Sequence, residues 1–146
     1  MSNWPYIKGL HDLGNSVYAY LQPDGTWGWS NAGIVTSGDT SLLIDTLYDL
    51  RLTQDMLDTM RKSIPAAAHI DMVMNTHSNG DHCYGNQLVA DAQIIASAST
   101  AQEMIEGISP SQFAALLKQA PQFGQLGQYL GRIFAPFDFE NITLTP

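Results

Sequence analysis

The chain has a single cysteine, Cys83, among its 146 residues, and this scarcity excludes a framework of internal disulfide bonds. Such a composition is typical of a reducing compartment, and the start M-S-N-W-P-Y-I-K lacks the basic region and apolar core of a signal peptide. No apolar run approaches the roughly 20 residues that a membrane-spanning helix needs. The sequence therefore predicts a cytoplasmic protein with no membrane partner.

Basic residues are also few. Six lysine and arginine side chains stand against fourteen acidic ones, which gives a formal net charge of −8. A surface this acidic repels phosphate backbones, and the basic residues are scattered, with Arg61 and Lys62 as the only adjacent pair. We therefore expect no nucleic-acid partner, and a nuclease activity is disfavoured.

The first 45 residues have the character of β structure. The run V-Y-A-Y-L at 17 to 21 is rich in β-forming residues, and P-D-G at 23 to 25 predicts a turn. These features predict a meander of short antiparallel strands. Apolar residues then recur at helical spacing, with Thr53 as the predicted N-cap and Pro65 as the residue that stops the helix.

Two short apolar runs, at 70 to 74 and at 93 to 96, are typical of strands inside a covered sheet. Serines at 99 and 109, each followed three residues later by glutamine, predict capping boxes for two further helices. The final N-I-T-L-T-P at 141 to 146 predicts the start of another strand. This order predicts an α/β fold, a mixed sheet with helices packed on it, in which residues 1-146 form a single domain.

The loop N-T-H-S-N-G-D-H-C-Y-G-N, residues 75 to 86, concentrates polar groups directly after the strand predicted at 70 to 74. His77, Asp81 and His82 lie within six positions, and imidazole and carboxylate are the ligands that zinc prefers. The alternative is a polar, capped loop that leads into a short helix at 83 to 89, with the histidines merely hydrogen-bonded. The spacing alone does not decide between the two.

The same loop resembles the signature loop of the metallo-β-lactamase-fold hydrolases, His-x-His-x-Asp-His. The runs L-L-I-D-T, G-N-Q-L and Q-I-I-A-S follow the order of that family, so the resemblance covers roughly residues 15 to 97. It implies the N-terminal half of an αββα sandwich that binds one or two metal ions at one edge of its sheets. It also implies a lid over the substrate for the helical segment at about 98-131, although the apolar spacing there fits core packing equally well.

The resemblance also assigns site residues. His77 resembles the first ligand of one metal site, and Asp81 and His82 resemble ligands of the other. Asp45 resembles a family acid that supports the loop from behind the ligands, where such partners orient them. Asp45 is equally consistent with an ordinary helix-entry or turn aspartate.

Asn79 departs from the family pattern, because it stands where the family places its second histidine. An amide oxygen is a weaker zinc ligand than an imidazole nitrogen, which favours one bound ion over two. In one interpretation Asn79 is a weak ligand or orients water or substrate. In the other it forms a turn with Gly80 in the left-handed conformation that asparagine tolerates.

These features together predict a metal-dependent hydrolase in which Asp81 is catalytic. A metal-bound water would attack an ester, lactam, thioester or similar bond of a small-molecule substrate. Zinc is the first expectation for the ion, with manganese or iron as alternatives. Trp27 and Trp29 are candidates for a substrate wall, although tryptophans that merely pack a hairpin are commoner.

The family's remaining ligands are absent, because no histidine follows His82. We therefore expect the chain to be an N-terminal half whose partner is a missing C-terminal half or a second copy in a homodimer. The alternative function is a catalytically degenerate, metal-poor domain of the same fold that serves binding or assembly.

Overall fold

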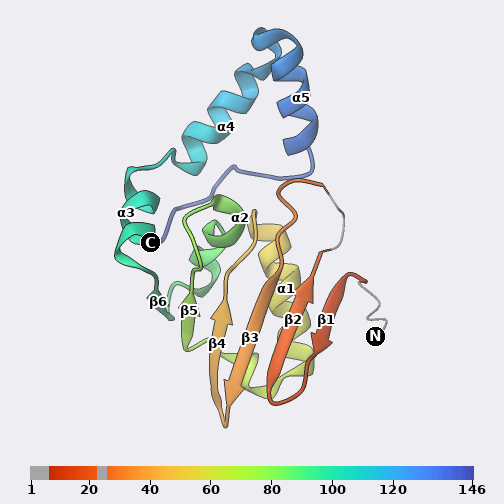
Figure 1. Cartoon of the computed structure of the whole chain (residues 1–146), viewed down its shortest axis with the longest axis vertical. Coiled ribbons are helices and arrows are strands. Elements are labelled where there is room, and N and C mark those ends of the chain that lie inside the picture. The colour runs from red at the N-terminus through yellow and green to blue at the C-terminus, as the bar shows by residue number, and fades with distance from the viewer. Residues whose placement is uncertain (1–6, 23–25) are drawn as a thin grey trace.

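One mixed sheet of six strands forms the centre of the computed structural model, which describes residues 7–22 and 26–146 (Figure 1). Its strands are β1 (Gly9–Asp12), β2 (Val17–Leu21), β3 (Ala32–Ser37), β4 (Thr40–Ile44), β5 (Met72–Met74) and β6 (Gln93–Ile95). They lie in chain order, antiparallel from β1 to β4 and parallel from β4 to β6. The predicted α/β fold with its antiparallel meander is confirmed, and the turn predicted at 23 to 25 lies outside the described residues.

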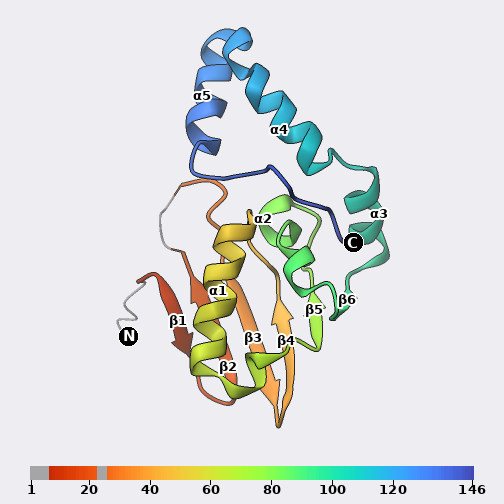
Figure 2. The same ribbon diagram turned by 180° about the vertical axis from the view of Figure 1, so that it is seen from behind.

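Helix α1 (Leu50–Ser63) covers one face of the sheet, as Figure 2 shows from behind. Ile34, Leu43 and Val73 are cross-strand neighbours on the face where the core lies, and all three are fully buried. They share one core cluster with the apolar face of the helix, namely Leu52, Met56, Leu57 and Met60. Each such side chain contributes about 1.5–3 kcal/mol by leaving water, so this layer fixes the sheet on which the loops sit.

The start of α1 differs from the prediction. Asp49 is the N-cap, and its carboxylate accepts a hydrogen bond from the Leu52 amide at 2.6 Å. Thr53 lies inside the first turn, where its hydroxyl accepts from the Leu47 amide at 3.1 Å. The predicted end of the helix before Pro65 is confirmed.

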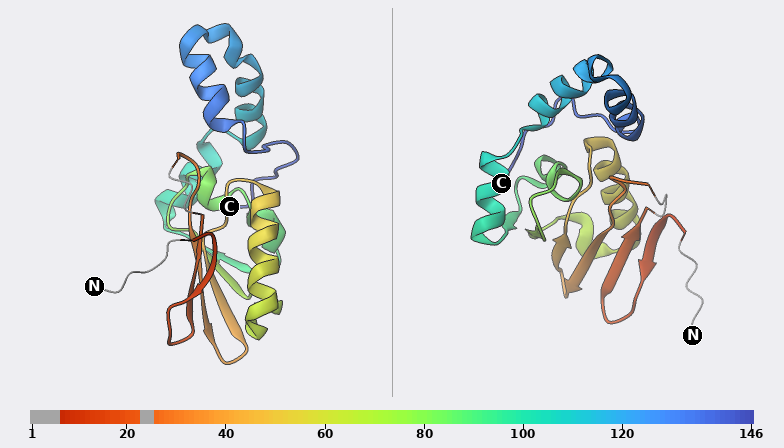
Figure 3. Two further views of the ribbon diagram at one scale, coloured as in Figure 1. Left: turned by 90° about the vertical axis from the view of Figure 1, so that its right-hand side faces the viewer. Right: turned by 45° about the horizontal axis from the view of Figure 1, so that its top comes forward.

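Of the remaining helices, α2 (Gly80–Cys83) lies within the loop 75 to 86, and α3 (Ala98–Glu106), α4 (Pro110–Gln119) and α5 (Gly124–Phe134) follow β6. There are 3-10 turns at Pro65–Ala68, Asn86–Val89 and Ala120–Phe123. The capping box at Ser109 is confirmed, whereas α3 is capped by Ser97 rather than by Ser99. Helices α4 and α5 form a hairpin that stands above the sheet, well separated from α1 in the side view (Figure 3). No helix in the described ranges is long and apolar enough to span a bilayer.

The strand predicted at 141 to 146 is wrong. The segment after α5 instead crosses back towards α2 and α3 without joining the sheet (Figure 1). Side chains take the place of a strand partner, because the Thr143 amide donates to Gln87 Oε1 at 2.5 Å and Asn86 Nδ2 donates to the Thr145 carbonyl at 2.9 Å.

Candidate metal centre

The loop 75 to 86 lies at one edge of the sheet because the three parallel strands β4, β5 and β6 all end there. Asp45 follows β4, and Asn75 and Thr76 follow β5. Ligands of open α/β sheets bind beyond the carboxyl ends of such strands. This edge is therefore where the sequence-predicted residues can meet.

Asp45 is buried and holds both ends of the loop. One carboxylate oxygen accepts from the Thr76 amide at 2.8 Å, and the other accepts from the Thr76 hydroxyl at 2.8 Å and from His82 Nδ1 at 2.9 Å. Its φ of 62° places it in the left-handed region, which aspartate tolerates better than most residues. Asp49 rather than Asp45 caps α1, so Asp45 acts on the loop and not as a helix-entry residue.

The Asp45 carboxylate also determines which ring nitrogens carry protons. Because the Thr76 hydroxyl donates to Asp45, its oxygen is left to accept from His77 Nδ1, which lies 2.9 Å away. Both His77 and His82 thus hold a proton on Nδ1 when neutral, and Nε2 of each keeps its lone pair. A histidine held in this way by a carboxylate is the usual state of a metal ligand.

His82 lies between two carboxylates, since its Nε2 is 3.4 Å from Asp81 Oδ2 while Nδ1 contacts Asp45. Burial disfavours the charged ring, but the hydrogen bonds and negative charges of Asp45 and Asp81 outweigh it and raise the pKa of His82 to about 9. In the absence of a metal, therefore, this imidazole is a cation at neutral pH. A metal ion would have to displace that proton.

The structure places His82 beside both His77 and Asp81. The rings of His77 and His82 lie with centroids 4.0 Å apart, and Asp81 adjoins His82. In the part of the chain that the structure describes, however, no three His, Cys, Asp or Glu side chains form a group able to hold an ion. The side chains are chemically suited to a divalent ion. As they lie in this structure, they do not form the group of three protein ligands that is typical of catalytic zinc. Their role as ligands stays a prediction.

Asn79 occupies the N-cap position of α2 with φ −64° and ψ 139°, so the left-handed turn predicted as its alternative role is wrong. Its side chain makes no capping hydrogen bond. It lines a cavity of about 500 Å³ together with Ser78, Glu103 and Ile108. Whether it binds a metal, water or substrate stays a prediction.

Trp27 and Trp29 pack against the helical hairpin and the segment after it. Trp27 meets Phe134 edge-on at 5.0 Å between ring centroids, and Trp29 tilts against Phe137 at 5.1 Å. Both line a second cavity of about 500 Å³. The connection between β2 and β3 reaches the loop through Ser30, whose hydroxyl donates to the Asp81 carbonyl. The substrate wall stays a prediction.

Sequence reasoning missed the buried polar residues that hold the His82 backbone. The His82 carbonyl accepts from the Thr46 amide at 3.0 Å and from Asn75 Nδ2 at 2.8 Å. Asn86, which is fully buried, donates in turn to Asn75 Oδ1 at 2.8 Å. The only signal for this network was an asparagine at each end of the loop. Cys83 beside it is buried, which raises the pKa of the thiol to about 12.

Comparison with known proteins agrees with the fold of the chain. A family model of the metallo-beta-lactamase superfamily matches residues 25–141. Similar solved structures include a metallo beta lactamase from Hirschia baltica, 21% identical with a TM-score of 0.54, where the match covers 68% of this chain and 48% of that chain. FIM-1 from Pseudomonas aeruginosa, in its mono-zinc form, is 19% identical with a TM-score of 0.52, over 70% of this chain and 48% of that chain.

A third solved structure, TMB-1, is 26% identical with a TM-score of 0.52, and the match covers 66% of this chain and 46% of that chain. The chain thus spans about half the length of the structures it matches. No curated protein matches it significantly.

Proposed function

The chain belongs to the metallo-beta-lactamase superfamily, and from this membership we propose that it is the loop-bearing part of a metal-dependent hydrolase. The observation that supports the proposal best is that His82 lies beside both His77 and Asp81 at the carboxyl edge of the sheet. Asp45 behind them orients both imidazoles so that Nε2 of each is the nitrogen left for a metal, once the metal displaces the extra proton of His82.

In this proposal His77, Asp81 and His82 hold one ion, and ligands from outside the described residues complete the site. A divalent ion bound there lowers the pKa of a coordinated water to near neutrality. Two imidazoles suit zinc, the first expectation for the ion, better than manganese, and they also suit iron. Asp45 prevents the rings from rotating away, and Asp81 accepts a hydrogen bond that steers the attacking water. The substrate is an ester, lactam or thioester of a small molecule.

The completing ligands come from a C-terminal half or from a second copy of the chain, and the charge of −8 disfavours nucleic acid as a partner. A cytoplasmic location is part of the same proposal, since one buried cysteine suits a reducing compartment.

The test is elemental analysis of the purified chain after growth in metal-replete medium, together with hydrolysis assays on ester, lactam and thioester substrates. We expect close to one equivalent of metal in the native sequence and loss of both metal and turnover in Asp81→Ala and His82→Ala. His69→Ala is the matched control, because His69 is exposed and pairs only with exposed Asp91. Retained turnover in both loop variants would end the proposal.

A second candidate, a degenerate domain used for binding or assembly, is favoured by Asn79 and by the incomplete set of donors. It predicts less than about a tenth of an equivalent of metal in the native sequence, in a chain that is nevertheless well folded.

A further inference from the structure

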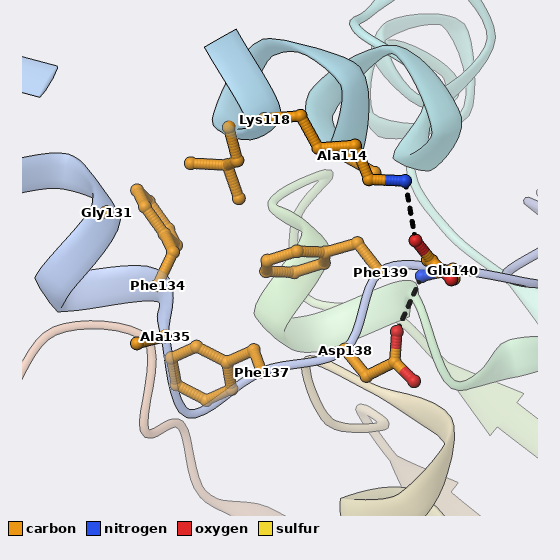
Figure 4. A pocket seen from close by; sticks show the side chains of 10 residues that line it. Ala114, Lys118, Gly131, Phe134, Ala135, Phe137, Asp138, Phe139 and Glu140 are labelled. Carbon is orange, nitrogen blue, oxygen red and sulfur yellow. Dashed lines mark hydrogen bonds and ion pairs between the residues drawn. The ribbon is translucent and has the colours of Figure 1, made fainter. Parts of the chain in front are cut away.

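A separate cavity of about 290 Å³ lies between α4, α5 and the segment that follows α5 (Figure 4). Phe134, Phe137 and Phe139 surround one side of it, and Lys118 with Glu140 stands at the other. None of the loop residues 75 to 86, all of which are described, lines this cavity. It is therefore distinct from the candidate metal centre.

The aromatic wall is preformed. Phe113 meets Phe134 and Phe139 edge-on, with ring centroids 4.8 and 5.0 Å away, so neither ring can swing without breaking a contact. Free space continues to the backbone of α5, because a Cβ added at Gly131 would meet no atom within 4 Å. A wall that needs no rearrangement costs a ligand little on binding.

The size of the cavity limits its occupant. The cavity is open to solvent on one side and has a volume of about 290 Å³. It lies near the lower end of the range of small-molecule sites. An occupant would therefore have two small rings or a chain of about eight to ten carbon atoms.

The mouth of the cavity is acidic. Lys118 Nζ pairs with Glu140 Oε1 at 2.6 Å, and the Glu140 amide donates to the carboxylate of Asp138 at 2.8 Å. Two carboxylates against one ammonium leave a net charge of −1 at the rim, on a chain whose total is −8. Aromatic ring faces also attract cations. Both features select a positively charged head group over a negatively charged one.

We propose that this cavity binds a small amphipathic amine, with its apolar body against Phe134 and Phe139 and its ammonium group at Asp138 and Glu140. The inference does not depend on a metal, so it can be tested in the presence of a chelator and independently of any hydrolase activity.

The experiment is calorimetric titration of the full chain with three probes of one length: n-octylamine, 1-octanol and octanoate. We expect octylamine to bind most tightly and octanoate most weakly. The advantage of the amine over the alcohol should be about threefold at low salt and should shrink at high salt. Octanoate binding as tightly as octylamine, or the absence of saturable binding by any probe, would overturn the proposal.

Two variants localise the binding. Gly131→Leu fills the cavity and should weaken octylamine and octanol alike by about tenfold or more, whereas Gln128→Leu, exposed on the same helix, should not. Asp138→Asn keeps an acceptor for the Glu140 amide and should remove only the advantage of the amine. If Gly131→Leu fails to fold by circular dichroism, the Asp138→Asn comparison decides alone. Unchanged binding in Asp138→Asn and in any folded Gly131→Leu contradicts the site.

Discussion

Replacing Asp45 with alanine should destabilise the metal-free chain by about 3–5 kcal/mol, the cost of breaking a buried charged pair. The carboxylate accepts three hydrogen bonds, and each such bond to a charged group contributes about 1.5–3 kcal/mol. The sum overestimates the loss, because Thr76 is exposed and water can replace Asp45 there. Alanine must also adopt a φ of 62°, which adds about 1 kcal/mol of strain.

Asp45→Asn should cost about 2–3 kcal/mol at pH 6.5, most of it the lost attraction to the His82 cation. Asparagine tolerates the left-handed conformation and keeps one acceptor oxygen for the Thr76 amide. It loses the charge that faces His82. The difference between the two variants therefore separates the backbone and hydrogen-bond contribution from the electrostatic one.

The electrostatic contribution has its own pH signature. Because the pKa of His82 is raised in the folded chain from 6.5 to about 9, the stabilisation is complete below pH 6.5 and is lost as the pH rises towards 9. A shift of that size corresponds to about 3 kcal/mol across this window. Asp45→Asn should weaken this dependence, leaving the part that comes from Asp81.

Urea denaturation in the presence of a chelator, at pH 6.5 and pH 9, measures both effects. Asp71→Ala is the matched control, since Asp71 accepts from the Ser41 amide at 2.8 Å at the opposite end of the parallel strands. It should lower stability without changing the pH dependence. The reasoning is refuted if Asp45→Ala costs less than about 1 kcal/mol, or if Asp45→Asn keeps the full pH dependence.

Thr76→Val removes the hydroxyl that links Asp45 to His77 by hydrogen bonds. It should weaken metal binding about 10–100-fold in a competition titration. Thr59→Val, on the exposed side of α1, is the control. Asn79→His supplies the missing imidazole and should raise the metal content found by elemental analysis; an unchanged content would show that position 79 does not face the ion. Gly85→Ala should cost about 1–3 kcal/mol in urea melts, because its Cβ collides with the Thr53 side chain. Cys83, whose buried thiol has a pKa raised to about 12, should react with a thiol reagent only after unfolding, and rapid labelling of the native chain would contradict its burial.

The strands and the loop could be predicted because their signals are local. Alternating or continuous apolar runs mark β2, β5 and β6, and the spacing of His77, Asp81 and His82 is visible in one line of sequence. Their common location also follows, since parallel strands deliver their loops to the same edge.

The first residues of the helices were harder to predict than the strands, because several residues able to cap a helix lie within one turn of each other. Asp49 and Thr53 compete at α1, and Ser97 and Ser99 compete at α3. Tertiary contacts decide the first case, since the Thr53 hydroxyl is already engaged by the Leu47 amide. Propensity alone carries no information on that contact.

The support of the site could not be predicted in full, because it joins residues far apart in the chain. Asn86 reaches Thr46 at 3.1 Å and the Thr145 carbonyl at 2.9 Å, across 40 and 59 positions. The failure of the strand predicted at 141 to 146 has the same origin, because that segment is held by Gln87 and Asn86 and not by a neighbouring strand.

Asn79 is exposed and lies beyond the ends of the strands, so a change at this position can alter the candidate metal site without altering the stability of the fold. The Asn79 side chain makes no capping hydrogen bond, so we expect Asn79→His to leave the melting temperature nearly unchanged. Good expression of a protein with histidine or asparagine at this position consequently does not show whether it turns over a substrate. Only an assay that follows the ion or the substrate can distinguish a working catalyst from a well-folded relative that has lost its reaction.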